Sequence, residues 1–261
     1  MAKFRTRART IDMLGRQQIA GIPTAINELF KNAYDAYANH VEIDFYRSDR
    51  LFVLRDDGVG MTREDFEGRW LTVGTESKIN TMEPPYIPKG CKLRKLMGEK
   101  GIGRLSIAVI GSQVLVLTRA KREGSLHNLV ATYIHWDIFS CPGINLDELE
   151  IPIREFKDGK LPSAKDIQSM LNEFQNSLEN NSRIPQNMLA KIKKDISLFT
   201  IDSVKIDGFL DHSTPTLTLK DKGNGTHFII KPASELLSDD IDQSSSDLAS
   251  PLEKALLGFT N

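Results

Sequence analysis

The sequence predicts an α+β fold in which amphipathic helices accompany a sheet. Residues 23–40 place apolar side chains at helical spacing, which is typical of a helix that buries one face. Residues 41–46 and 51–55 are rich in β-forming side chains, and the short polar link between them indicates a hairpin. Further strand-like runs that extend the predicted sheet lie at 113–119, 129–136 and 216–231.

Composition places the chain among ordinary globular proteins. Its 261 residues are 40% hydrophobic and 26% charged, and the formal net charge of −1 gives no overall attraction to nucleic acid or anionic membranes. Cys91 and Cys141 show no zinc-type spacing with the five His, so we expect two free thiols. No apolar run approaches the roughly 20 residues of a membrane span, and none follows the basic N-terminus. We therefore expect no membrane partner and a cytoplasmic protein, or a nuclear one in a eukaryote.

The first long helix carries the most informative pattern. Pro23 suits its first turn, because the missing proline N–H would have no partner there. Glu28, Asn32 and Asp35 occupy positions i, i+4 and i+7 and so share one face. Two carboxylates and an amide in line can hold a hydrated hard cation and polarise a water, although the same pattern also suits a solvated polar face. The apolar positions that predict the buried face are Ile22, Ile26, Leu29, Ala33 and Ala36.

The elements after the hairpin are separated by polar and glycine-rich segments. Thr62 is predicted to cap a short helix, with Asp65 at the capping-box position. Residues 77–100 are rich in Pro, Lys and Gly and lack periodicity, so they predict a long loop before a helix that ends near Gly111. Two further helices, about 163–178 and 186–194, are predicted before the last strand.

Two glycine-rich segments lie where such residues shape ligand pockets. Asp56 leaves a strand into a turn with Gly58 and Gly60, where its carboxylate can accept a hydrogen bond from an exocyclic amine or bond only local amides. The segment GEKGIGR, residues 98–104, opens a helix whose unpaired N–H groups suit a phosphate. Its glycine spacing is neither that of a P-loop nor that of the dinucleotide fingerprint. Thr226, in GTHF, carries little information by itself.

The order of these segments resembles one family. ELFKNAYDA looks like the N-box, DDGVGM the first glycine box, GEKGIGR the second and GTHF the late Gly-Thr motif of the GHKL superfamily (gyrase, the ninety-kilodalton heat-shock chaperone, histidine kinases and MutL). The resemblance covers about residues 20–120 and 223–231. It implies a Bergerat-type α/β sandwich, with a mixed, mostly antiparallel sheet, helices on one face and a partly helical insertion.

The resemblance also implies ATP and Mg²⁺ as cofactors and a role for each motif residue. Asn32 would coordinate magnesium, Glu28 would act as the general base on the attacking water, and Asp35 would support the nucleotide or its water shell. Asp56 would accept the adenine amine. The remaining implied nucleotide contacts are Gly58, Gly60 and Met61 around the base, Thr226 beside Asp56, and Gly101, Ile102 and Gly103 at the phosphates. Lys78 and Lys100 are candidates for phosphate contacts and equally for solvated lysines.

Glu28 favours an ATPase over a histidine kinase, because the kinases of this superfamily usually lack a carboxylate at that position. No histidine lies upstream of Pro23 to accept a phosphoryl group. The segment WLTVGTESK, residues 70–78, looks more like chaperone, MutL or Morc-type relatives than kinases. The alternatives are a kinase-type phosphotransfer domain, a non-hydrolysing ATP sensor and a pure interaction module.

The predicted organisation is that of an ATPase module within a larger protein. Residues 1–22 form an N-terminal strap or arm, 23–145 and 195–232 the ATP-binding domain, 146–194 a helical insertion, and 233–261 a polar linker that begins a following region. We expect slow hydrolysis by this chain alone and ATP-dependent homodimerisation in the full-length protein. A protein or nucleic-acid client is compatible with the sequence, which does not select between them.

Overall fold

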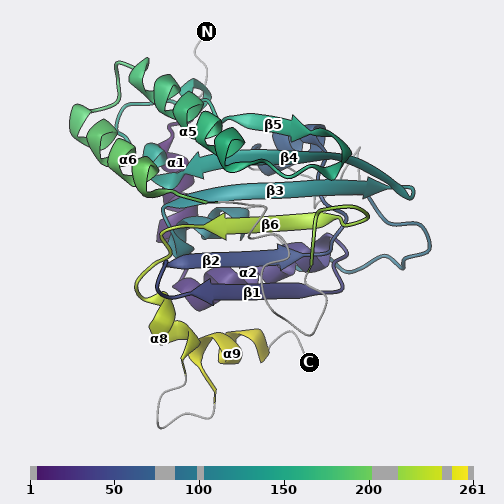
Figure 1. Ribbon diagram of the computed structural model, residues 1–261. Helices are drawn as coiled ribbons and strands as arrows, with labels where there is room; N and C mark the ends of the chain where they lie inside the picture. The colour runs from purple at the N-terminus through teal and green to yellow at the C-terminus, as the bar shows by residue number, and fades with distance from the viewer. Residues whose placement is uncertain (1–4, 74–85, 99–102, 202–216, 243–248, 258–261) are drawn as a thin grey trace.

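The computed structural model describes residues 5–73, 86–98, 103–201, 217–242 and 249–257. Six strands form one sheet in the order β1-β2-β6-β3-β4-β5, and all neighbouring pairs are antiparallel (Figure 1). The predicted hairpin and the α+β class are confirmed. The strands are β1 (Val41–Tyr46), β2 (Leu51–Asp56), β3 (Gln113–Arg122), β4 (Ser125–His135), β5 (Ile153–Phe156) and β6 (Gly225–Ile230).

The long helix α2 (Ile22–Asp35) lies against one face of the sheet and buries the predicted apolar stripe except Ala36, which caps the helix end and is half-buried (Figure 1). The helix is shorter than the pattern over residues 23–40 predicts. It ends because Tyr37 adopts a left-handed backbone conformation, φ 62°, and the Ala38 N–H returns to the Ala33 carbonyl at 3.0 Å. The helix that follows the glycine-rich loop is a 3₁₀ turn at Gly103–Ser106 continued by α4 (Ile107–Ile110), which packs beside α2.

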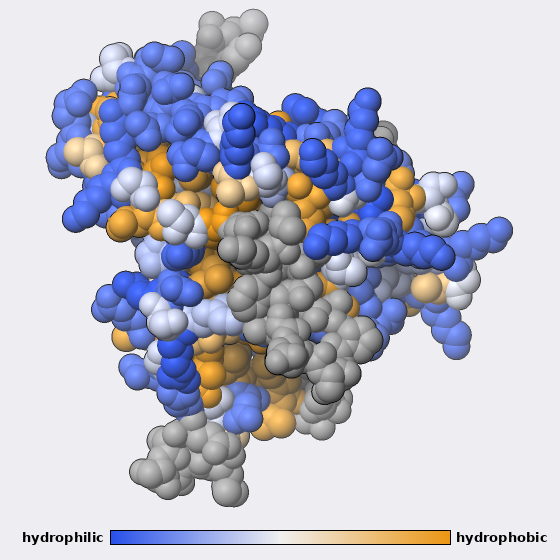
Figure 2. Space-filling view, viewed as in Figure 1, coloured by the Kyte–Doolittle hydropathy of each residue, from blue (hydrophilic) through white to orange (hydrophobic). Residues whose placement is uncertain are grey.

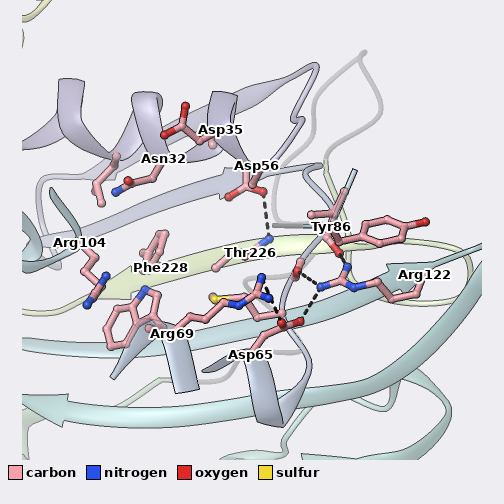
Figure 3. Close-up of a pocket in the computed structure, with 17 residues that line it drawn as sticks. Asn32, Asp35, Asp56, Asp65, Arg69, Tyr86, Arg104, Arg122, Thr226 and Phe228 are labelled. Carbon is pink, nitrogen blue, oxygen red and sulfur yellow. Dashed lines mark hydrogen bonds and ion pairs between the residues drawn. The ribbon is translucent and has the colours of Figure 1, made fainter. Parts of the chain in front are cut away.

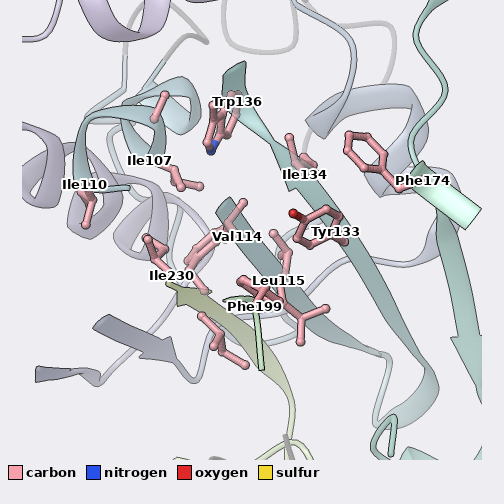
Figure 4. Packing of buried hydrophobic residues seen from close by; sticks show 14 of the residues in the cluster. Ile107, Ile110, Val114, Leu115, Tyr133, Ile134, Trp136, Phe174, Phe199 and Ile230 are labelled. Atoms are coloured by element: carbon pink, nitrogen blue, oxygen red, sulfur yellow. The ribbon is translucent and has the colours of Figure 1, made fainter. Parts of the chain in front are cut away.

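The segment 146–194 joins the same hydrophobic core. It supplies β5, which pairs with β4, and the helices α5 (Ala164–Glu179) and α6 (Gln186–Leu198). On the sheet face opposite α2, the ring of Tyr133 in β4 contacts Phe174 of α5 and Phe199, with ring centroids 5.3 and 5.1 Å apart (Figure 4). The outward side of α5 and α6 is hydrophilic (Figure 2), as expected of amphipathic helices.

Shorter elements complete the described chain. The helix α1 (Arg9–Asp12) docks on its own chain, where the N–H of Ala8 donates to the Ile144 carbonyl at 3.0 Å. The predicted capping box of Thr62 and Asp65 is present at α3 (Arg63–Asp65), which continues as a π-helical turn through Trp70. At the C-terminal side lie α8 (Leu237–Ile241) and α9 (Pro251–Leu256), and Asn27 of α2 donates to the Ala255 carbonyl. None of the helices described is long and apolar enough to cross a membrane.

Candidate functional site

A cavity of about 230 Å³ opens between α2, the end of β2 and strands β3 and β6 (Figure 3). Its walls contain residues from all four sequence motifs, which are far apart along the chain. The predicted site residues that line it are Asn32, Asp35, Asp56, Gly60, Met61 and Thr226. Glycine-box, helix and late-strand residues are therefore brought together as the sequence predicts.

The polar ridge of α2 faces the start of the glycine-rich helix. A Cβ atom added to Gly103 would lie 2.7 Å from Glu28 Oε2 and 3.5 Å from Asn32 Nδ2, so a larger residue there would displace the Glu28 carboxylate. The other oxygen of Glu28, Oε1, accepts from Lys31 Nζ at 2.7 Å. Glu28 thus borders the cavity without lining it, and Asn32 lines it directly.

Asp56 is the buried carboxylate of the cavity, with only 4% of its surface exposed. Its Oδ1 accepts two backbone hydrogen bonds, from Gly58 at 2.9 Å and from Thr226 at 3.2 Å, the second of which is drawn in Figure 3. Burial raises the pKa of Asp56 to about 7, although both hydrogen bonds favour the ionised form. Its Oδ2 accepts from no side chain or amide within the described part of the chain, so it is available to a ligand.

The neighbouring Asp57 has different hydrogen-bond partners. Its Oδ1 accepts from the backbone N–H groups of Asn39 and His40, and its Oδ2 lies 2.9 Å from His40 Nδ1. Burial works against ionisation, but hydrogen bonds from His40 and Asn39 hold the pKa of Asp57 below its ordinary value. Asp57 therefore fastens the loop after α2, and it does not line the cavity.

The glycine turn after β2 is fixed by close backbone contacts. Gly60 has φ 61°, and a Cβ atom there would lie 2.0 Å from the Arg119 carbonyl oxygen. Thr118 of β3 holds the same region, because its Oγ1 accepts from the Met61 N–H, donates to the Gly225 carbonyl and lies 3.0 Å from Thr226 Oγ1. Sequence reasoning did not find Thr118, because only the placement of β6 between β2 and β3 brings it here.

Three arginines and one tyrosine also line the cavity and were not predicted: Arg69, Arg104, Arg122 and Tyr86. Arg122 donates to the Val59 and Gly60 carbonyls and pairs with Asp65 at 2.6 Å. Its guanidinium lies 4.7 Å from the ring centre of Tyr86. Arg104 is the last residue of the GEKGIGR motif, and this motif is the one sequence signal that could have identified an arginine here. Burial lowers the pKa of Arg104 to about 10.

Asp35 occupies the rim of the cavity, and its carboxylate points away from Phe228 (Figure 3). The two oxygens of Asp35 accept the backbone N–H groups of Met97 at 2.8 Å and Gly98 at 3.1 Å. Asp35 therefore binds the protein backbone. The sequence predicted a different role for it, which was support of the nucleotide or its water shell. The predicted site residues Lys78, Lys100, Gly101 and Ile102 lie outside the described residues.

A second group of potential metal ligands lies apart from this cavity, where His135, Asp137 and Asp195 bring their ligand atoms within 4.8 Å of one another. Asp137 already pairs with Arg16 at 2.6 Å and with Lys191 at 2.5 Å. These two cations offset the charge of Asp137, and the carboxylate of Asp195 lies 3.4 Å from His135 Nε2. We interpret the group as an ion-pair network that joins α6 to the end of β4.

Comparison with known protein families shows which family this chain belongs to. The family described as histidine kinase-, DNA gyrase B- and HSP90-like ATPase matches residues 21–156. The chain belongs to this family. As a GHKL ATPase domain it carries the family's ATP-binding fold, and the matched range contains the α2 ridge and both glycine boxes.

Individual relatives support the predicted likeness to the chaperone and Morc branch. The chain is 32% identical to the chaperone protein HtpG of Buchnera aphidicola over 95 residues, which cover 35% of this chain and 14% of that protein. It is 32% identical to ATPase morc-1 of Caenorhabditis elegans over 139 residues, covering 49% of this chain and 14% of that protein. HtpG of Mycobacterium tuberculosis is 27% identical over 146 residues, covering 47% of the chain and 22% of the protein. The GHKL domain thus aligns with less than a quarter of each of these longer relatives.

Proposed function

We propose that this GHKL domain binds ATP with magnesium and hydrolyses it. The observation that carries the proposal is that one cavity contains the buried carboxylate of Asp56 and the amide of Asn32, and has Glu28 packed against Gly103 at its border. A carboxylate with one open oxygen suits a base amine, and an amide–carboxylate ridge beside a glycine-rich helix start suits phosphate and water.

The base would bind at the Asp56 end. Both backbone hydrogen bonds of Asp56 go to Oδ1, so Oδ2 remains to accept the exocyclic amine of adenine. Thr226 would contribute through its hydroxyl, which Thr118 holds at 3.0 Å. Gly58, Gly60 and Met61 would shape the space around the ring. A buried acceptor favours a base with an amine at this position over one with a carbonyl, because two facing acceptors leave an unpaired polar group.

The phosphates would bind at the opposite end, between α2 and the helix that begins at Gly103. Magnesium prefers oxygen ligands and usually keeps waters and substrate phosphates in its shell, so a single amide oxygen from Asn32 fits it. When bound, the ion would neutralise charge on the phosphates. Glu28 would orient the attacking water and accept its proton, and Gly103 leaves the space that this carboxylate needs. The predicted phosphate contacts of Lys78, Lys100, Gly101 and Ile102 belong to the same proposal.

The test measures release of inorganic phosphate from ATP and magnesium by the wild type, Glu28→Ala and Glu173→Ala. Glu173 is an exposed glutamate of α5 and serves as the matched control. We expect the wild type and the control to hydrolyse ATP slowly, and Glu28→Ala to bind ATP without turnover. Hydrolysis that survives Glu28→Ala would remove the general-base assignment. Binding without hydrolysis by the wild type would instead favour a non-hydrolysing sensor.

We also propose that ATP binding drives homodimerisation within a longer protein. The relatives named as a chaperone and as a Morc ATPase are several times longer than their aligned regions, which supports a motor module that acts on further domains. Sedimentation velocity with a non-hydrolysable ATP analogue should show a dimer that the ligand-free chain lacks. A monomer at all nucleotide concentrations would restrict the proposal to ATP binding and hydrolysis.

A further inference from the structure

The segment from Tyr86 to Gly98, which leads into the glycine-rich loop, is fastened to the C-terminal end of α2. Arg94 Nη1 donates to the carbonyl oxygens of Tyr34 at 3.0 Å and Ala38 at 2.9 Å. Its guanidinium also lies 4.8 and 5.0 Å from the ring centres of Tyr34 and Tyr37. The last carbonyls of a helix lack helical partners and carry partial negative charge, so a flat cation with several N–H donors suits this position.

A second attachment lies three residues further on. The carboxylate of Asp35 accepts the consecutive N–H groups of Met97 and Gly98, one on each oxygen. Gly98 is the first residue of GEKGIGR, and Gly103, near the end of that motif, lies against Glu28. The two described flanks of the loop therefore rest on one helix. Asp35 and Glu28 are seven residues apart, a rise of about 10 Å along α2.

We infer that Arg94 and Asp35 are positioning residues that hold the segment leading into the glycine-rich motif, up to Gly98, at a fixed place relative to Asn32 before nucleotide binds. Their role depends on the ATP site proposed above. Arg94 is not among the described residues that line the cavity, so it acts through the backbone it holds. A flanking segment held in advance loses less conformational freedom when phosphate binds, which strengthens binding of the phosphates and leaves the nucleoside contacts unchanged.

The test compares ATP, ADP and adenosine as ligands, by calorimetric titration in the presence of magnesium, for the wild type, Arg94→Met and Asp35→Asn. We expect both variants to bind ATP and ADP at least tenfold more weakly and adenosine within about twofold of the wild type. Lys92→Met is the matched control, because Lys92 is an exposed cation of the same segment, and it tests whether loss of charge alone weakens phosphate binding. Arg94→Lys keeps the charge but loses the planar fork, and should give an intermediate loss for ATP.

Adenosine binding also reports whether each variant is folded. An equal loss of ATP and adenosine affinity in Arg94→Met would overturn the inference, since it would show a general structural role. An equal loss in Asp35→Asn would show that Asp35 touches the nucleoside, and a tenfold loss of ATP in Lys92→Met would attribute the effect to charge. Unchanged ATP affinity in both Arg94→Met and Asp35→Asn would also contradict the inference. If the wild type binds neither ATP nor adenosine, the proposed ATP site itself fails, which is a distinct result.

Discussion

Replacing Asp56 with asparagine should stabilise the ligand-free protein and weaken its binding of the base. Burial is the main cause that raises the pKa of Asp56 from its ordinary 3.8 to about 7. At 1.36 kcal/mol per pKa unit, the ionised carboxylate costs the fold up to about 4 kcal/mol above pH 7. Asparagine keeps an oxygen for the Gly58 and Thr226 N–H groups, and it carries no charge to bury.

The sign of the pH dependence follows from linkage. Because the folded-state pKa lies above the unfolded one, protonated Asp56 favours the fold; this contribution is complete below about pH 4 and is lost as the pH rises through 7. The advantage of Asp56→Asn should therefore grow by about 2 to 3 kcal/mol between pH 5 and pH 8, measured by urea unfolding without nucleotide. Asp57→Asn is the control. The pKa of Asp57 is lowered, so that variant should lose stability at pH 8.

Binding should change in the opposite direction. With the asparagine oxygen turned to the two backbone amides, its NH₂ group would face the adenine amine, and two donors would meet. We expect ATP and adenosine affinities to fall by about 10- to 100-fold, the usual consequence of an unpaired buried polar group at about 1 to 3 kcal/mol. If Asp56→Asn lowers stability equally at pH 5 and pH 8, the carboxylate is not a buried charge and the reasoning fails.

Three further expectations concern the glycines and the metal. Gly103→Ala should lower kcat for ATP hydrolysis at least tenfold, with a smaller change in adenosine affinity, because the new Cβ would lie 2.7 Å from Glu28 Oε2. Gly60→Ala should destabilise the fold by more than about 2 kcal/mol in urea unfolding, since φ is 61° and the Cβ would lie 2.0 Å from the Arg119 carbonyl oxygen. Removing magnesium with EDTA should stop phosphate release while adenosine binding persists; hydrolysis that continues in EDTA would contradict the metal assignment.

Features that depend on local periodicity could be predicted from the sequence. The ridge of Glu28, Asn32 and Asp35 follows from 3.6 residues per turn, and the structure places it on one helix beside the second glycine box. The hairpin of β1 and β2 follows equally from two β-rich runs with a short polar link. Helix ends were less predictable, because α2 stops where Tyr37 takes a left-handed conformation that favours glycine or asparagine and no such residue marks the position.

Features that depend on strand order could not be predicted in this way. Arg122 lines the cavity and Thr118 contacts its lining residue Thr226 because β6 pairs with both β2 and β3, a pairing between segments more than 100 residues apart. The roles of Arg94 and Asp35 are hidden for a similar reason: an arginine in a loop without periodicity gives no sign that it reaches back to the carbonyls of a helix. Motif spacing identifies residues on one element, and tertiary pairing decides which other residues meet them.

Asp56 and Asp57 show why tertiary structure, in addition to sequence motifs, is needed to assign a candidate site. They are adjacent, have the same side chain and precede the same glycine, so local chemistry alone allows either to accept the base. Asp56 is the last residue of β2, paired with Thr226, and strand alternation turns it to the α2 face, where the cavity lies. Asp57 follows the strand; its Oδ1 accepts the Asn39 and His40 amides and its Oδ2 contacts the His40 ring, so both of its oxygens are used. Since an acceptor that is already satisfied has little to offer a ligand, the backbone direction at the end of one strand favours Asp56 over Asp57 as the carboxylate that we propose to bind the base.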